Sequence, residues 1–172
     1  LSDISEGMME DARRSLPEDL YSFMVFPLQK IPFRSGYFDG VSANHVLFYL
    51  NDVNEGLKEI CRVIRPGGVL YASAYGKNHM NEITRLVQEF DPSISLSSVP
   101  LYERFGIENG QELLQKHFDQ VEFIPYKDSL KVTSARDLAE YILSCHGNQA
   151  EKLVGCYDEF LAFLEKRMKE KG

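Results

Sequence analysis

The stretch IPFRSGYFDGVSANHVLFYLNDVNEGLKEICRVIRPGGVL, residues 31–70, contains the pattern that decides the fold of this 172-residue chain. Residues 38–47 are mostly apolar without clean alternation, which is typical of a strand covered on both faces. Residues 53–64 place apolar side chains on one helical face and polar side chains on the other. Residues 69–74 are again short and apolar. Strand, helix and strand in this order predict a βαβ unit.

The expected helix has recognisable signals at both ends. Asp52 precedes it and can accept hydrogen bonds from the backbone N–H groups of the first turn. After it, Arg65 supplies a cation near the negative helix end, and Pro66 cannot continue the helix. Gly67 and Gly68 then allow a left-handed exit into the next strand.

This stretch resembles class I S-adenosylmethionine-dependent methyltransferases, in the small-molecule branch that includes the ubiquinone and menaquinone methyltransferases. In that family a PF-x-x-x-x-FD segment leads into strand 4, and a helix ending in R-V-L-K-P-G-G leads into strand 5. This chain has IPFRSGYFD at residues 31–39 and CRVIRPGG at residues 61–68. The resemblance covers about the first two-thirds of the chain. It implies an α/β fold with a Rossmann-like, doubly wound, mostly parallel sheet and a C-terminal antiparallel hairpin, here residues 119–126 and 130–132.

The resemblance also implies a cofactor, S-adenosylmethionine. Residues 3–8, DISEGM, correspond to the family's D-x-S-x-x-M arrangement after strand 2, whose acidic side chain accepts hydrogen bonds from two ribose hydroxyls. This places Asp3 and Ile4 in the cofactor site. Ser5 is a plausible N-cap of the helix that follows. The alternative reading is that Asp3 merely helps to cap that helix.

Residues 21–28 are expected to form strand 3, and the residues at its end are expected to contact the adenine. By the resemblance these are Leu28, which can pack on the ring, and Gln29. The family usually has an acidic residue where this chain has Pro27, so the acceptor for the adenine amine differs here.

Strand 4 is expected to end at residues 42–45. Ligands of doubly wound sheets bind beyond the carboxyl ends of the strands, so the side chains there face the cofactor and the substrate. Asn44 could hydrogen-bond the methionine moiety or the substrate. His45 could act as a general base, because an imidazole titrates near neutral pH. The alternative is that His45 only shapes the pocket, since methyl transfer needs mainly alignment and exclusion of water.

In similar methyltransferases the segment after strand 5 builds a substrate lid, which corresponds here to residues 77–105. Tyr102, Arg104 and Phe105 are its expected contact residues, because a cation between two aromatic rings can hold a carboxylate or a flat ring. The alternative is a packed surface loop.

We divide the chain into a partial methyltransferase core, residues 1–133 with the lid at 77–105, and a C-terminal helical extension, residues 134–172. The family's strand 1 and its loop G-x-G-x-G should precede Asp3, and no glycine cluster supplies them. We therefore expect an N-terminally truncated domain that binds its cofactor poorly. Its unpaired strand edges favour a homodimer.

Composition limits the partners. A net charge of -7 argues against a nucleic-acid partner, because phosphate binding needs clustered cations. No apolar run is long enough to span a membrane, and the histidines and three cysteines lack the spacing of metal ligands. The expected partner is a small-molecule methyl acceptor, and the expected location is the cytoplasm.

The favoured function is S-adenosylmethionine-dependent methyl transfer to a small molecule. One alternative is a non-catalytic methyltransferase-like interaction module, which Pro27 would fit. Another is a fragment of a nucleotide-binding dehydrogenase, because an acidic residue after strand 2 also holds the ribose of NAD. The acceptor atom has no signature in the sequence.

Overall fold

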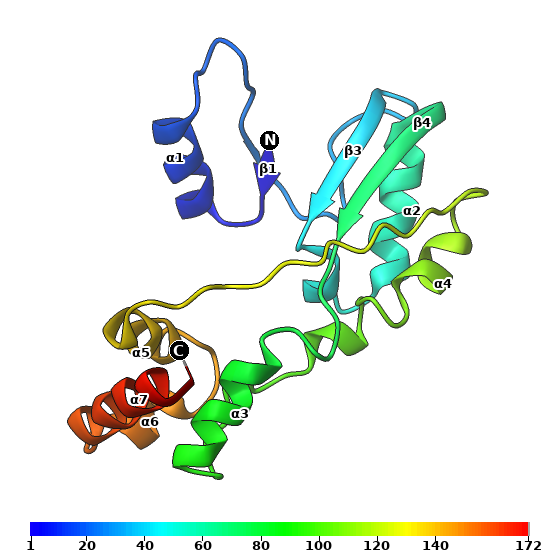
Figure 1. Ribbon diagram of the computed structural model, residues 1–172. Helices are drawn as coiled ribbons and strands as arrows, with labels where there is room; N and C mark the ends of the chain where they lie inside the picture. Colours follow the sequence, from blue (N-terminus) through cyan, green and yellow to red (C-terminus); the bar gives the residue numbers. More distant parts are fainter. Residues whose placement is uncertain (172) are drawn as a thin grey trace. The chain divides into compact units, whose positions relative to one another are not determined.

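The structure is a computed structural model that describes residues 1–171 (Figure 1). The chain forms two compact units. The first unit consists of residues 1–76 and 101–123, and the second unit of residues 77–100 and the chain from Ile124 onward. Residues 77–100, the greater part of the expected lid, thus group with the C-terminal helices.

Short strands, helices and two 3-10 turns build the first unit. In chain order they are β1 (Ser2–Asp3), α1 (Glu6–Ser15), β2 (Met24–Val25), β3 (Phe38–Asn44), η1 (Leu47–Tyr49), α2 (Val53–Val63), β4 (Ile64–Ser73), η2 (Leu101–Glu103) and α4 (Gly110–Gln115).

The predicted βαβ unit is confirmed. β3 and β4 are parallel, with Val41 opposite Leu70 and Ala43 opposite Ala72. The helix α2 lies along this pair (Figure 1). The core that they share is fully apolar and includes Ala43, Leu47, Phe48, Leu57, Ile60 and Val63, each at most 3% exposed. This burial drives the packing of α2 on the strand pair.

The start of α2 is as predicted, but its end differs. The Asp52 carboxylate accepts the N–H groups of Asn54 and Glu55 at 2.9 and 3.2 Å. The helix ends at Val63 and continues directly into extended backbone, without a left-handed residue at that point. Gly67, with φ of 78°, instead lies in the irregular start of β4, where the register with β3 shifts. The glycines therefore shape the strand entry rather than the helix exit.

A pair of charged side chains on α2 holds the segment that precedes β3 against the helix. Arg62 and Glu59 form a two-point ion pair, with Nε–Oε1 and Nη2–Oε2 distances of 2.8 and 2.7 Å. Arg62 also donates to the carbonyl oxygens of Phe33 and Ile31, at 2.7 and 2.9 Å. Glu59 accepts the N–H of Ile31 at 3.0 Å. This pair therefore satisfies the backbone of a turn that has no strand partner.

The single sheet that the resemblance implies is divided into two parallel pairs. β1 pairs with β2 through Ser2–Met24 and Asp3–Val25, and β3 pairs with β4. Within residues 1–171 no strand joins the two pairs. The expected strand at 21–28 is reduced to the two residues of β2, Met24 and Val25, which pair only with the two residues of β1.

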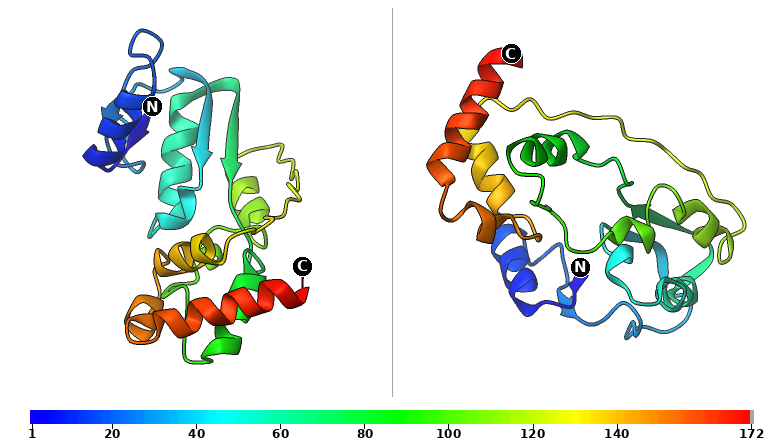
Figure 2. Two further views of the ribbon diagram at one scale, coloured as in Figure 1. Left: turned by 60° about the vertical axis from the view of Figure 1, so that its left-hand side comes forward. Right: turned by 90° about the horizontal axis from the view of Figure 1, so that it is seen from below.

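The second unit is helical. Its elements are α3 (Asn81–Phe90), α5 (Ala135–Leu143), α6 (Gln149–Leu153) and α7 (Tyr157–Lys171). Ser134 caps α5 by accepting the N–H of Asp137 at 3.2 Å. α7 packs beside α5 (Figure 2). The core residues with less than 3% exposure are Val87, Ile94, Ala139, Ile142, Leu153, Phe160 and Leu164.

The predicted antiparallel hairpin is wrong in this structure. Residues 119–134 form neither helix nor strand, and Phe123, Ile124 and Tyr126 are 49%, 76% and 88% exposed. A two-stranded hairpin needs a sheet edge or an apolar surface to be stable, and this segment pairs with no strand of the described chain. Alternating apolar and polar residues predict a strand, but they do not provide the neighbouring strand or surface that it needs.

The ion pair on α2 predicts a dependence of stability on pH. The hydrogen bond from Arg62 lowers the pKa of Glu59 below its ordinary value of 4.5. A lowered carboxyl pKa adds stability above the unfolded-state pKa, and this contribution is lost as the pH falls through the folded-state pKa. Glu59→Gln should therefore lower the free energy of unfolding by urea at neutral pH, with a smaller difference from the wild type near pH 3.

The matched control is Asp39→Asn. It removes an ion pair to Arg65 of 2.6 Å in which the two side chains are 86% and 58% exposed. Exposed pairs contribute little, so this variant should stay within about 1 kcal/mol of the wild type. Equal losses in the two variants would contradict the role of the Glu59–Arg62 pair.

The two glycines at the start of β4 should respond differently to alanine. A Cβ on Gly68 would lie 2.6 Å from the carbonyl oxygen of Asp39, whereas one on Gly67 would meet no atom within 4 Å. Gly68→Ala should therefore lower the free energy of unfolding by about 1–3 kcal/mol through overpacking. Gly67→Ala should cost about 1–2 kcal/mol through its left-handed backbone, and Gly67→Asn less. Wild-type stability of Gly68→Ala in urea unfolding would disprove the close approach.

Candidate cofactor and acceptor site

The carboxyl ends of β3 and β4 lie side by side. Asn44 is the last residue of β3 and is paired in register with Ser73, the last residue of β4. The residues that follow, His45 and Tyr75, therefore leave the sheet at the same edge. In parallel α/β sheets this edge is where ligands bind.

The backbone of His45 has an unusual conformation, and its N–H donates to two hydrogen-bond acceptors. Its φ is 50°, in the left-handed region that few residues other than glycine adopt. Its N–H donates to the carbonyl oxygen of Ser73 at 3.2 Å and to the hydroxyl oxygen of Ser73 at 3.1 Å. The residue as a whole is exposed. The structure thus fixes the backbone of His45 while its side chain stays accessible.

The rings of Tyr75 and Phe48 lie beside the imidazole of His45. The ring of Tyr75 is nearly parallel to that of His45, with 6.5 Å between centroids and 21° between planes. Phe48, which is 2% exposed, presents its ring at 62° to both, with centroids 6.1 Å from His45 and 5.0 Å from Tyr75. Burial, and secondarily the neighbouring Tyr49, raises the pKa of Tyr75. The Tyr75 hydroxyl therefore stays protonated at neutral pH.

Asn44 is exposed, and its side-chain oxygen accepts the hydroxyl of Ser42 at 3.0 Å. The interaction holds the amide beside the end of β3. An amide has two donor hydrogens and one acceptor oxygen, so Asn44 keeps capacity for a ligand at this edge.

Asp3 ends β1 and joins it to α1. One carboxylate oxygen, Oδ1, accepts the N–H of Ser5 at 2.8 Å, and the hydroxyl oxygen of Ser5 accepts the N–H of Met8 at 3.3 Å. Asp3 is half-buried, whereas Ile4 is 74% exposed. The predicted helix cap at Ser5 is confirmed, and Asp3 supports the turn before it. A carboxylate has about four acceptor positions, so this contact leaves room for ribose hydroxyls.

Leu28 and Gln29 lie in a turn after β2, and both are half-buried. The turn is closed by a hydrogen bond of 3.0 Å from the N–H of Lys30 to the carbonyl oxygen of Pro27. Leu28 packs against the apolar core beside Gly56 of α2. The resemblance assigns Leu28 to the adenine, but part of its side chain is in contact with the core.

The three expected lid residues differ in exposure. The segment after η2 is attached to the end of β4 by a hydrogen bond of 3.4 Å from the N–H of Ile107 to the carbonyl oxygen of Tyr75. Tyr102 is half-buried and Arg104 is exposed. Phe105 is 3% exposed and packs in the core of the first unit, with its ring against Gly110. The structure therefore places Phe105 in the core, and only Tyr102 and Arg104 near the surface.

All the sequence-predicted site residues belong to the first unit, but they fall on two separate strand pairs. Asp3 ends β1 and the turn at Leu28 follows β2, whereas Asn44 ends β3 and His45 follows it. Ser73 and Tyr75 are not among the sequence-predicted site residues. The strand register that pairs Ser73 with Asn44, and the ring contact of Tyr75 with His45, bring them to this edge.

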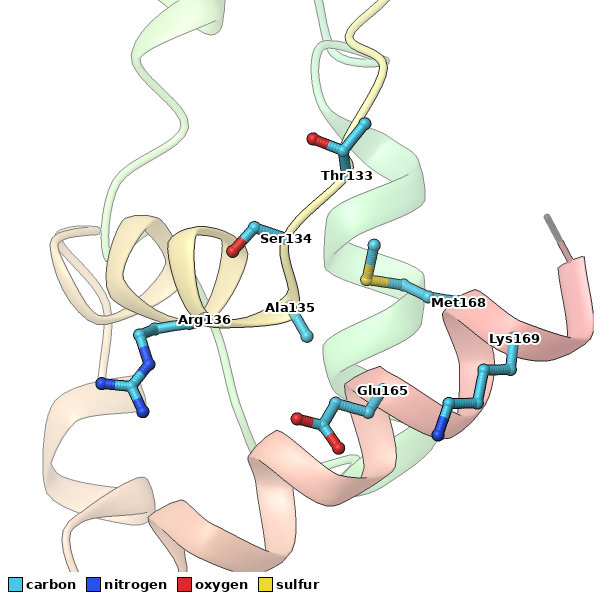
Figure 3. Close-up of a pocket in the computed structure, with 7 residues that line it drawn as sticks. All are labelled: Thr133, Ser134, Ala135, Arg136, Glu165, Met168 and Lys169. Atoms are coloured by element: carbon cyan, nitrogen blue, oxygen red, sulfur yellow. The ribbon is translucent and has the colours of Figure 1, made fainter.

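The second unit contains a shallow pocket of about 380 Å³ between the start of α5 and α7 (Figure 3). It is lined by Thr133, Ser134, Ala135, Arg136, Glu165, Met168 and Lys169. None of the predicted site residues lines it. Among residues 1–171 no cluster of three or more histidines, cysteines or acidic residues is arranged to hold a metal ion. No helix in that range is long and apolar enough to cross a membrane.

Part of the first unit matches a known protein family. Residues 1–72 match the family model described as "Methyltransferase domain". The ubiquinone/menaquinone biosynthesis C-methyltransferase UbiE of Chromobacterium violaceum is 26% identical over 133 residues, which cover 76% of this chain and 52% of that protein. The malonyl-[acyl-carrier protein] O-methyltransferase of a Methylovorus species is 26% identical over 102 residues, or 55% of this chain and 34% of that protein.

Among solved structures, an S-adenosylmethionine-dependent methyltransferase of Thermotoga maritima, a possible histamine N-methyltransferase, aligns with a TM-score of 0.49 at 19% identity. The alignment covers 67% of this chain and 52% of that protein. The chain thus spans about half the length, or less, of the relatives that it matches.

The burial of Phe105 leads to a test of its role. Phe105→Ala should lower the free energy of unfolding by about 3–5 kcal/mol, because it removes a ring from the core. Tyr102→Ala, at a half-buried position in the same segment, should cost clearly less. Urea unfolding of both variants measures the difference. If the free energy of unfolding of Phe105→Ala equals that of the wild type, Phe105 is not a core residue. Its expected contact with the substrate would then again be the better interpretation.

Proposed function

We propose, from the place of residues 1–72 in a family of methyltransferase domains, that this protein transfers a methyl group from S-adenosylmethionine to a small-molecule acceptor. Over this part the chain is related to class I S-adenosylmethionine-dependent methyltransferases. The relatives named above methylate carbon and oxygen respectively, so their names leave the acceptor atom of this protein open.

One observation carries the proposal. Two polar side chains that the sequence predicts near the reacting groups, Asn44 at the end of β3 and His45 after it, lie beside Ser73 and Tyr75 at the end of β4. A ligand bound at this edge would meet an amide, an imidazole and a protonated phenol within one small area. Such a group of donors and acceptors suits the alignment of a nucleophile with a methyl donor.

The residues present fit the cofactor in part. Asp3 has acceptor capacity for the ribose hydroxyls besides its contact with Ser5. Leu28 offers an apolar surface to the adenine, and the amide of Gln29 lies in the same turn. Pro27 has no side-chain acceptor for the adenine amine, so that contact would come from the backbone or from the amide oxygen of Gln29.

S-adenosylmethionine, when bound, supplies a methyl group on a positively charged sulfur. Asn44 would orient the donor or the acceptor through its amide. His45 would accept the proton from an acceptor hydroxyl or an acidic carbon, which makes the acceptor more nucleophilic. Tyr102 and Arg104, on the segment attached to the end of β4, would contact the acceptor and help to exclude water.

A non-catalytic interaction module is the second candidate, and the observation that favours it is Pro27 in place of the family's acidic residue. A dehydrogenase-like site, which would use Asp3 on the ribose of NAD, is the third. A cytoplasmic location and a homodimer remain predictions.

The proposal is tested by isothermal titration of S-adenosylhomocysteine and, separately, NAD into the protein with its complete coding sequence. S-adenosylhomocysteine should bind and NAD should not. Asp3→Asn should weaken binding by roughly 10- to 100-fold, because it removes a charged acceptor of two hydrogen bonds. Asp11→Asn is the matched control, since Asp11 lies on the exposed side of α1 with Arg14, its Oδ1 3.4 Å from Nη1.

Each outcome has a distinct meaning. Binding of NAD alone would favour the dehydrogenase reading. If the folded protein binds neither compound, methyl transfer is ruled out and the interaction-module reading takes its place. Equal affinities of Asp3→Asn and Asp11→Asn would remove Asp3 from the cofactor site.

A further inference from the structure

We propose that Ser73 is a positioning residue, whose hydroxyl fixes His45 in the orientation from which it faces a methyl acceptor. This inference rests on the proposed function, because that function gives His45 its role. Ser73 is not one of the sequence-predicted site residues. The proposal follows from three features of the carboxyl end of β3 and β4.

The first feature is the backbone of His45. A φ of 50° is unfavourable for a residue with a Cβ, and such conformations persist only where neighbouring groups hold them. Here a single N–H has two acceptors, the carbonyl oxygen of Ser73 at 3.2 Å and its hydroxyl oxygen at 3.1 Å. Both acceptors belong to one residue of the neighbouring strand.

The second feature is that one of these acceptors depends on the amino acid at position 73. Every residue at this position would offer a carbonyl oxygen, but few would offer a side-chain acceptor to the same N–H. Ser73 is also opposite Asn44 in the register of β3 and β4, which brings its hydroxyl to the turn at His45. The hydrogen bond from the His45 N–H to the Ser73 hydroxyl therefore depends on having serine, or another residue with a side-chain acceptor, at position 73.

The third feature is the surroundings of the imidazole. The ring of Phe48 is buried and stands at 62° to the His45 ring, and Tyr75 is nearly parallel to His45. Tyr75 follows Ser73 by two residues on the same chain segment. Ser73 and Tyr75 together thus set the backbone and the ring environment of His45, so a small rotation of the peptide at His45 would move the imidazole off its neighbours.

The test is nuclear magnetic resonance of histidine ring signals in the protein with its complete coding sequence. The signal of His45 is assigned from the spectrum of His45→Asn. Ser73→Ala should shift the His45 ring signal and remove its nuclear Overhauser contacts to Phe48 and Tyr75, while the signals of His117 and His146 stay in place. Ser73→Thr keeps a hydroxyl and should restore the wild-type signal and contacts.

Two further variants keep the test decisive. Ser73→Cys retains the side-chain volume with a weak acceptor, so it should give an intermediate shift even if Ser73→Ala does not fold. Ser15→Ala is the matched control, because it removes a hydroxyl that donates to the backbone carbonyl oxygen of Asp11 in α1, at 2.9 Å. It should leave the His45 signal unchanged.

Addition of S-adenosylhomocysteine separates this inference from the proposed function. Binding that moves the His45 signal in wild type and Ser73→Thr, with a smaller response in Ser73→Ala, supports both. A His45 signal that is unchanged by Ser73→Ala, or that Ser73→Thr does not restore, overturns the role of Ser73. If S-adenosylhomocysteine does not bind at all, the proposed function fails, while the spectra of the unliganded variants still decide whether Ser73 fixes His45.

Discussion

The parallel pairing of β3 with β4, covered on one face by α2, is the interaction on which the first unit depends. The fully buried side chains of Leu57, Ile60 and Val63 hold the helix against the strands, and each contributes about 1.5–3 kcal/mol through burial. The register of this pair brings the last residues of both strands to one edge. That register places Asn44 and Ser73 opposite each other, and the residues that follow them, including His45 and Tyr75, at the same edge.

Two local features keep the pair in this geometry. The Glu59–Arg62 ion pair connects α2 to the backbone at Ile31 and Phe33, so the segment that leads into β3 is attached to the helix that leads out of it. Gly68 allows the backbone of β4 to approach Asp39 in β3. The PF-x-x-x-x-FD and P-G-G segments of this chain thus have a common physical role, because both shape the entry of the two strands.

Local signals predicted the elements well. Asp52 and Ser5 each cap the helix that the sequence assigned to them, because a cap depends only on residues within one turn. Features that depend on distant partners were less predictable. The alternating residues at 119–126 form no strand, since alternation does not provide a sheet edge, and Phe105 is a core residue because Gly110 gives its ring a place to pack. Ser73 and Tyr75 became candidates only when the register of β4 with β3 was known.

The central claim is that the cofactor and acceptor meet at the carboxyl ends of the strands in the first unit. Hydrogen–deuterium exchange of the protein with its complete coding sequence, with and without saturating S-adenosylhomocysteine, tests it most directly. We expect slower exchange on binding at residues 3–5, 43–49 and 73–76. Protection confined to residues 81–90 and 135–171, or no protection at any of these segments, would contradict the account.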